Sequence, residues 1–164
     1  MQQPGRDILI FEVGGRRFGL PAANVRELVR AVALISLPGG PANVEGVFDF
    51  RGSVIPVLDI RQRLGIPAKP IGLGDQIIIG EARRRLVAIR VDRALQLVGA
   101  GASATNGDAN GSDHQNSQGS AERITKLDEG LAPILDLAYL FNESEADSLS
   151  HYLPKSWADS EGAR

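Results

Sequence analysis

Two aspartates, Asp59 and Asp136, stand at matching places in the sequence and could form a carboxylate pair for general acid–base chemistry. Each ends an apolar stretch that contains a proline: residues 52–60 read GSVIPVLDI, and residues 130–137 read GLAPILDL. An aspartate directly before a short helical turn is more simply explained as an N-cap, because its carboxylate can accept a hydrogen bond from a backbone N–H of the first turn. We therefore interpret both aspartates as helix caps.

The other groups that could do chemistry are few. His114 and His151 lie in or near polar segments, away from a plausible serine nucleophile, and they do not form a metal-binding pair. The absence of cysteine excludes thiolate catalysis and cysteine metal sites. Gly72-Leu73-Gly74 precedes an expected strand rather than opening a helix, so it does not fit a nucleotide-binding turn. These observations predict a protein that is not an enzyme and that holds neither a cofactor nor a metal.

Charge and composition narrow the possible partners. The net charge of −2 gives no broad attraction for nucleic acid or anionic membranes. The basic run Arg83–Arg85 could touch phosphate, but without interleaved aromatic residues a solvated turn is the better interpretation. Residues 1–7 lack the apolar core of a signal peptide, and no apolar run approaches the length of a membrane span. We expect a cytoplasmic protein with no nucleic-acid partner and no direct membrane insertion.

The matching aspartates belong to an internal repeat. Residues 7–13 (DILIFEV) resemble residues 75–81 (DQIIIGE), at an offset of 68 residues, whereas Asp59 and Asp136 are 77 residues apart. An insertion in the second half must account for the difference, and the polar segment 99–121 lies where it is needed. A repeat of this kind predicts two similar β units in tandem.

The first unit has clear strand and turn signals. Residues 8–13 and 18–20 are expected to form a hairpin across Gly14-Gly15, and residues 21–24 a turn or short helix that leads into a strand. Residues 47–50 and 54–58 are expected to form a second hairpin across residues 51–53. Asp59 as N-cap and Gly65 as C′ residue bound a short helix over residues 60–64.

The second unit repeats this plan. The expected strands are residues 76–81, 86–91, 95–98, 124–127 and 131–135, and Asp136 caps a helix over residues 137–141. Pro56 and Pro133 each remove one hydrogen bond from a strand ladder, which predicts edges or bulges at those positions.

Two segments of the second half stand outside the repeat. Residues 99–121, which contain no apolar residue larger than alanine, are expected to be a disordered loop that includes His114. Asn142 and Glu145 resemble a capping box, which predicts a helix over residues 143–152, followed by a frayed tail. Trp157 in that tail is expected to pack back on the body of the protein.

Short strands, tight glycine turns and single helical turns favour a mainly β fold made of two tandem five-stranded SH3-like β-barrels with short helices. We expect the first barrel at residues 7–66, the second at residues 75–142, and a C-terminal helix and tail at residues 143–164. Because a unit of about 60 residues buries little apolar surface alone, the two barrels should pack on a shared core as one domain over residues 1–164.

Residues 44–61, which read VEGVFDFRGSVIPVLDIR, resemble the signature of the CheW family of chemotaxis coupling proteins. That signature has a V-x-G-V segment, an N-L-R-G turn and an apolar P-V-x-D-L-R strand. Upstream, Gly19–Pro21 and Val25–Leu28 resemble the family's G-I/L-P and V-x-E-I/V segments, and the likeness covers about residues 7–142. One departure is Asp49-Phe50, where the family has Asn-Leu.

The resemblance implies a single CheW-like domain that acts as a non-enzymatic adaptor. Such proteins couple the cytoplasmic tips of methyl-accepting chemotaxis receptors to the regulatory domain of a CheA-type histidine kinase in membrane-associated arrays. By position, Val25, Glu27, Gly46 and Arg51 match the family's partner-contact region and are the implied partner-binding residues.

Each of these positions also has a purely structural interpretation. Arg51 can pair with Glu27, Asp49 or another carboxylate of its own chain, Val25 can simply pack in the core, and Gly46 can be a place where a side chain does not fit. Other functions remain open as well: a CheW-like scaffold in a pathway controlling pili, biofilm or a second messenger, a small-barrel domain binding nucleic acid or a small ligand, or, remotely, a hydrolase.

Overall fold

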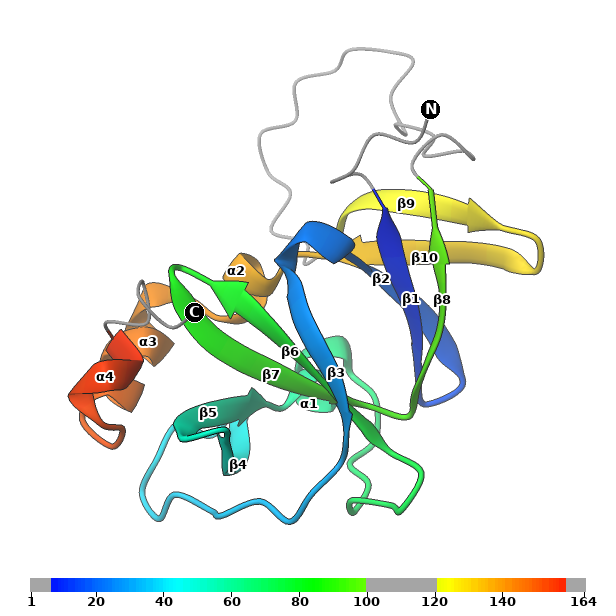
Figure 1. The fold of residues 1–164 in the computed structure, drawn as a ribbon. Coiled ribbons are helices and arrows are strands. Elements are labelled where there is room, and N and C mark those ends of the chain that lie inside the picture. The colour runs from blue at the N-terminus through cyan, green and yellow to red at the C-terminus, as the bar shows by residue number, and fades with distance from the viewer. Residues whose placement is uncertain (1–6, 100–120, 159–164) are drawn as a thin grey trace.

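The computed structural model describes residues 7–99 and 121–158, which form ten strands and several short helices (Figure 1). The strands are β1 (Ile8–Val13), β2 (Arg16–Pro21), β3 (Val25–Arg30), β4 (Val44–Phe50), β5 (Ser53–Leu58), β6 (Gln76–Ala82), β7 (Arg85–Val91), β8 (Arg93–Val98), β9 (Ala121–Leu127) and β10 (Gly130–Leu135). The helices are η1 (Ala22–Asn24), α1 (Ile60–Leu64), α2 (Leu137–Leu140), α3 (Glu143–Ser150) and α4 (Lys155–Ala158). The expected passage from a short helix into a strand is thus present at η1 and β3.

The strands form two five-stranded sheets of identical plan. The first sheet has the order β8-β1-β2-β10-β9, and the second has the order β3-β6-β7-β5-β4. In each sheet two hairpins meet through one parallel contact, β2 with β10 and β7 with β5, and the fifth strand adds antiparallel to the first hairpin. The prediction of a mainly β fold with two five-stranded units is confirmed.

The predicted assignment of residues 7–66 to one barrel and residues 75–142 to the other is wrong, because the two repeats exchange their first hairpins. The β1–β2 hairpin of the first repeat pairs with β8 and β10 of the second, while the β6–β7 hairpin pairs with β3 and β5 of the first. Helix η1 carries the chain directly from one sheet into the other. Since each repeat alone is small, this exchange lets both sheets draw on the whole chain for their cores.

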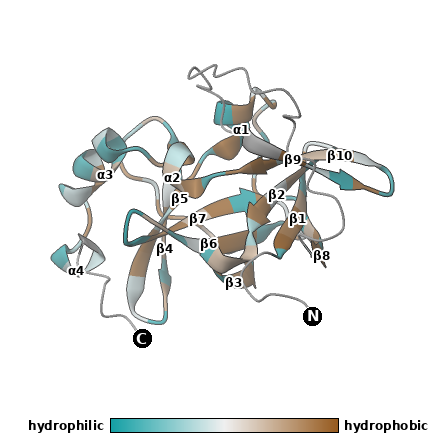
Figure 2. Ribbon diagram, turned by 90° about the horizontal axis from the view of Figure 1, so that it is seen from above, coloured by the Kyte–Doolittle hydropathy of each residue, from teal (hydrophilic) through white to brown (hydrophobic). Residues whose placement is uncertain are grey.

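The hydrophobic core follows from this exchange. Its largest cluster joins residues of both sheets to the C-terminal helices, including Phe11, Val47, Ile89, Phe141 and Trp157. Two smaller clusters each lie within one sheet, one around Ile55 and Ile77 and the other around Ile10 and Ile134. Figure 2 shows that the strands carry most of the hydrophobic residues, whereas α3 is mainly hydrophilic.

Both repeated aspartates are helix caps, as predicted. The Asp59 side chain accepts a hydrogen bond from the Gln62 backbone N–H, and α1 ends at Gly65 with φ of 70°. The Asp136 side chain accepts from the Ala138 backbone N–H at 2.9 Å. Asn142 and Glu145 form the predicted capping box of α3. Their roles are therefore local and structural.

The prolines in the repeated strands do not lie at sheet edges. Pro56 in β5 and Pro133 in β10 occupy strands with a neighbour on each side. However, the parallel ladder of β5 with β7 begins at Val57, and that of β10 with β2 lies at Ile134, one residue after each proline. The predicted edges are therefore not found, but a register shift lies close to each proline, between Val44 and Gly46 opposite Val57–Leu58 and between Ile134 and Leu135. Each proline is tolerated because the second ladder of its strand starts only after it.

The C-terminal segment is more ordered than the sequence predicts. Helix α3 ends at Ser150, and residues 155–158 of the supposedly frayed tail form α4. Trp157 is only 4% exposed and packs against Phe141, which confirms that it returns to the body of the protein. The disordered loop was expected over residues 99–121; residues 100–120, with His114, lie outside the described residues, and Ala121 begins β9. None of the helices in the described residues is long and apolar enough to cross a membrane.

Candidate functional site

Arg51 stands at the tip of the β4–β5 hairpin. Arg51 and Gly52 are the two turn residues, with φ of 52° and 87°. The Asp49 side chain accepts a hydrogen bond from the Gly52 backbone N–H at 2.8 Å and so fixes the turn. A carboxylate and an amide oxygen can accept this bond equally well, so Asp49 supplies what the asparagine of the family signature would supply.

The Arg51 guanidinium forms a two-pronged ion pair with Glu27 on β3. Its Nη1 and Nη2 atoms donate to the two carboxylate oxygens at 3.2 and 3.0 Å. The guanidinium carbon also lies 4.7 Å from the centre of the Phe50 ring. Nevertheless 72% of the Arg51 side chain is exposed, so its remaining donors face solvent.

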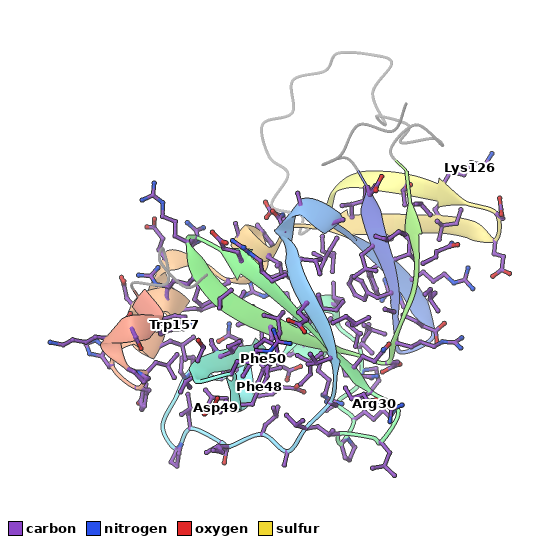
Figure 3. The ribbon with its side chains drawn as sticks, viewed as in Figure 1. Arg30, Phe48, Asp49, Phe50, Lys126 and Trp157 are labelled. Carbon is purple, nitrogen blue, oxygen red and sulfur yellow. The ribbon has the colours of Figure 1, made fainter. Side chains whose placement is uncertain are left out.

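This ion pair joins the two edges of the second sheet. Strands β3 and β4 are the first and last strands of that sheet. A second closure comes from the backbone of Ile35 and Val47, which exchange two hydrogen bonds of 2.8 Å. We call the line between β3 and β4, closed by these two contacts, the seam. Figure 3 labels Arg30 on one side of the seam and Phe48, Asp49 and Phe50 on the other.

Gly46 lies on the seam where the chain after β3 passes closest to β4. A Cβ atom on Gly46 would stand 2.7 Å from the Ile35 carbonyl oxygen and 3.0 Å from the Leu34 Cβ. Any side chain would therefore push away the segment that pairs with Val47. The geometry agrees with the interpretation of Gly46 as a position where a side chain does not fit.

The structure brings all four sequence-derived residues to the seam. Glu27 and Arg51 touch directly, Gly46 supports the backbone closure, and half-buried Val25 begins β3 and packs against the largest core cluster. Exposed apolar side chains follow the same line: Leu28 is 38%, Val32 46% and Ile35 68% exposed. An exposed arginine beside apolar side chains is the composition of a protein-binding surface rather than of an active site.

A buried charge network behind the seam was not foreseen from the sequence. Arg90 on β7 donates to both carboxylate oxygens of Glu45, at 3.0 and 2.7 Å, and to Asp75 at 2.8 Å. It also donates to the backbone carbonyls of Lys69 and Pro70. The side chains of Arg90 and Asp75 are 5% and 4% exposed. The signal was an arginine inside the apolar strand LVAIRV, since a charge in a buried strand requires a partner.

The network favours the ionised forms of Asp75 and Arg90. Burial acts to raise the pKa of Asp75, but hydrogen bonds from the Gly72 backbone N–H and from Arg90, together with the charge of Lys69, outweigh it and hold the pKa below its usual value. Hydrogen bonds to Glu45 and Asp75 raise the pKa of Arg90 despite its burial. Glu45 precedes Gly46, so the network fixes β4 just where the seam closes.

Two other arginines hold elements together. Arg61 donates to Asp92 at 2.7 Å, and Asp92 in turn accepts from the Gly14 backbone N–H, so the two sheets are linked. Arg83 donates to the carbonyls of Phe141 and Ala138 at the end of α2. The predicted turn is present at Arg83-Arg84 and both residues are exposed, but the Arg83 guanidinium also has backbone acceptors.

Nothing among the described residues suggests a metal centre. Within residues 7–99 and 121–158, no group of three or more histidine, cysteine, aspartate or glutamate side chains could hold a metal ion. The site at the seam is thus built from an ion pair, a glycine and apolar side chains.

Comparison with known proteins agrees with this architecture. The model of the CheW-like domain family matches residues 7–145. The scaffolding protein TtCheW from Thermoanaerobacter tengcongensis has a similar structure, with a TM-score of 0.71 and 24% sequence identity over 86% of this chain and 95% of that protein.

Relatives are found among several bacteria. A probable chemotaxis protein CheW of Rhizobium etli is 28% identical over 149 residues, which cover 90% of this chain and 95% of the relative. Protein FrzA of Myxococcus xanthus is 34% identical over 58% of this chain and 59% of its own length. With the matching signature, the paired sheets and the seam, the family match shows that this chain belongs to the CheW-like domain family of chemotaxis adaptors.

Proposed function

We propose that the protein is a non-enzymatic adaptor that couples methyl-accepting chemotaxis receptors to the regulatory domain of a CheA-type histidine kinase. It would act in the cytoplasm, at membrane-associated receptor arrays. The observation that carries the proposal is the exposed Arg51 at the closed seam, held by Glu27 and flanked by apolar side chains. Family membership supports the coupling role.

The four seam residues have different parts in this proposal. Arg51 makes the direct contact, because an exposed guanidinium keeps free donors for a partner's carboxylate or backbone carbonyl. Glu27 orients Arg51 from the opposite edge. Gly46 keeps the seam closed, and Val25 fixes the start of β3 on the core. A partly pre-oriented arginine loses less conformational freedom on binding than a free one.

A CheW-like scaffold in a different chemosensory pathway is a second candidate. Protein FrzA and Protein PilI of Pseudomonas aeruginosa are relatives that do not bear the CheW name. The local departure at Asp49-Phe50 puts an aromatic ring beside Arg51, which changes the surface that a partner meets. The two candidates differ in which kinase and receptors are bound, and not in the fold.

The proposal is tested by pulldown with the regulatory domain of the cognate kinase and, separately, with a receptor cytoplasmic fragment. Wild type is compared with Arg51→Ala and with a matched control, Arg26→Ala. Arg26 also lies in an exposed ion pair of β3, but its partner is Glu81 on the neighbouring strand β6, away from the seam. Circular dichroism checks that all three proteins are folded.

We expect wild type and Arg26→Ala to bind and Arg51→Ala to lose binding to at least one partner. Equal binding by all three proteins would keep the adaptor function but remove Arg51 from the contact. If folded wild type binds neither partner, the coupling proposal fails for this kinase and receptor, and the second candidate is tested with other chemosensory kinases.

A further inference from the structure

Each sheet contains a place where two parallel strands spread apart. In the second sheet, β5 and β7 pair only at Val57–Ala88 and Leu58–Ile89, near the end of β5. Before these pairs the two strands diverge toward their first residues (Figure 1). We call this space, between Val54 on β5 and Leu86 on β7, the first wedge.

The first wedge is filled by the chain's own C-terminal segment. Helix α4 contacts both β5 and β7. The indole Nε1–H of Trp157 donates to the Leu86 carbonyl at 2.9 Å, and the Arg85 guanidinium carbon lies 5.3 Å from the centre of the indole ring. Trp157 is 4% exposed, and half-buried Val54 packs on the cluster that contains it. A short helix with an aromatic side chain is therefore what this geometry accommodates.

The internal repeat creates the same space in the first sheet. There β10 and β2 pair only at Ile134–Gly19, and Figure 1 shows them spreading toward the β9–β10 turn. The ladders align Gly19 with Ala88 and Ile134 with Val57. It follows from the hairpin registers that Leu131 corresponds to Val54, Arg17 to Leu86 and Arg16 to Arg85. We call the space between Leu131 and Arg17 the second wedge.

The apolar side chains at the second wedge are exposed, whereas α4 packs against both strands of the first wedge. Leu131 is 64% exposed, and Ile124, which lies opposite Pro133 on β9, is 45% exposed. Arg17 on β2 forms an ion pair with Glu129 in the β9–β10 turn, and the Glu129 side chain is 70% exposed. Figure 3 shows Lys126 at this end of the molecule and Trp157 at the opposite end. An apolar side chain of this size at a diverging strand pair is a surface that a partner can bury.

We infer that the second wedge is a docking site for a short, acidic helical segment of a partner protein that inserts an aromatic side chain beside Leu131. The occupant of the first wedge is the guide to its shape. The guide to its charge is the pair of basic side chains at Leu131: Lys126 lies opposite Leu131 in the β9–β10 ladder, and Arg16 holds the place that Arg85 holds beside Trp157. Arg17 is already paired with Glu129. The inference does not depend on the role of Arg51.

The test uses a peptide that copies residues 143–158 as a probe, added to the isotope-labelled full-length chain and followed by NMR. The same peptide with Trp157→Ala is the control ligand. Two protein variants are compared: Leu131→Glu in the wedge and Leu97→Glu, which alters another exposed leucine of the first sheet, on β8.

We expect the Trp-containing peptide to shift the amide signals of Arg17 and Leu131, and the Ala peptide to shift neither. Leu131→Glu should weaken binding by about tenfold or more, as for loss of an interface anchor, and Leu97→Glu should leave it unchanged. Shifts confined to the first wedge, no shifts, or equal effects of both peptides would overturn the inference.

Sedimentation velocity of the unlabelled chain separates a partner protein from a second copy. We expect a monomer at micromolar concentration. Self-association that is lost in both Leu131→Glu and Trp157→Ala would show that a second copy's C-terminal segment occupies the wedge, which would contradict a separate partner protein.

Discussion

Arg51 combines a structural contact with high solvent exposure. Its two hydrogen bonds to Glu27 make it part of the barrel closure, yet most of its side chain remains in water. An ion pair this exposed contributes about 0–1 kcal/mol to stability, because solvent screens it and both side chains lose freedom. Its larger contribution can therefore be to binding, where a partner removes that solvent.

Gly46, in contrast to Arg51, should contribute mainly to stability, because its role is steric. We predict that Gly46→Ala lowers the free energy of unfolding by about 1–3 kcal/mol, since the added methyl group forces the Ile35 backbone away. Urea denaturation measures the change.

Gly74→Ala is the matched control for this substitution. No atom lies within 4 Å of the position that a Cβ on Gly74 would take. The free energy of unfolding of this variant should lie within about 0.5 kcal/mol of the wild-type value, as expected for a surface substitution. Equal stability of the two variants would contradict the prediction and show that the Ile35 segment moves aside at little cost in free energy.

The sequence predicts residue roles well where the cause is local. Asp59 and Asp136 could be recognised as caps because a cap needs only the next few residues. The partners of Arg90 could not be identified, since Glu45 and Asp75 lie 45 and 15 residues away along the chain. For Arg51 the sequence left several carboxylates open, and only the structure selects Glu27 and assigns Asp49 to the turn.

At the scale of elements, the hairpins could be predicted but their partners could not. Gly14-Gly15 and the turn at Arg51-Gly52 mark tight turns that involve adjacent residues only. The exchange of hairpins between repeats depends on contacts between segments far apart in the chain. Because the two repeats have the same strand pattern, either pairing satisfies the alternation of apolar residues, and the sequence pattern does not distinguish them.

The Arg90 network ties together elements that the exchange brings near. It joins β7 to β4 through Glu45 and to the segment before β6 through Asp75. Removing one partner from a buried pair leaves the other charge without compensation, which costs about 3–5 kcal/mol. We therefore regard the network as the main support of the seam from within.

Acid should weaken this support. The pKa of Asp75 is lower in the folded protein, so the unfolded chain takes up a proton first as the pH falls. Its stabilising contribution is complete above the unfolded value of about 4 and is lost as the pH drops through the folded value. We predict that Asp75→Asn destabilises the protein at pH 7 and that its stability falls less than that of wild type below about pH 4.

Asp147→Asn provides the control, because Asp147 is exposed on α3. Urea denaturation at a series of pH values should give it the same pH dependence as wild type. If the free energy of unfolding of Asp75→Asn falls with pH as steeply as that of wild type, carboxylates other than Asp75 cause the loss of stability in acid.

At the scale of the whole molecule, the fold gives two separate surfaces on one double-sheet body. The seam with Arg51 lies on the second sheet, whereas the wedge at Leu131 lies on the first sheet. The chain's own helix α4 covers the first wedge. A body with distinct surfaces and a shared core suits a protein that holds partners in a fixed arrangement.

The fold class and the C-terminal return of Trp157 could be predicted from the sequence, because strand signals and a lone tryptophan in a polar tail are strong patterns. Barrel boundaries could not, since they follow from the hairpin exchange. The candidate site residues came from the family resemblance and not from a local pattern, and the contact between Arg51 and Glu27 depends on β3 and β4 being opposite edges of one sheet.

The most direct test of the account is a charge swap across the seam. Glu27→Arg combined with Arg51→Glu keeps an ion pair between β3 and β4 but removes the arginine from the hairpin tip. Binding to the kinase regulatory domain and to the receptor fragment is measured by calorimetry for wild type, both single variants and the double variant. Urea denaturation accompanies each measurement.

We predict that the double variant is within about 1 kcal/mol of wild type in stability, as expected for an exposed pair, while its binding is weakened at least about tenfold. Loss of binding in both single variants with full recovery in the double variant would contradict the account. Arg51 would then act only as a latch of the barrel and not as a contact to the partner.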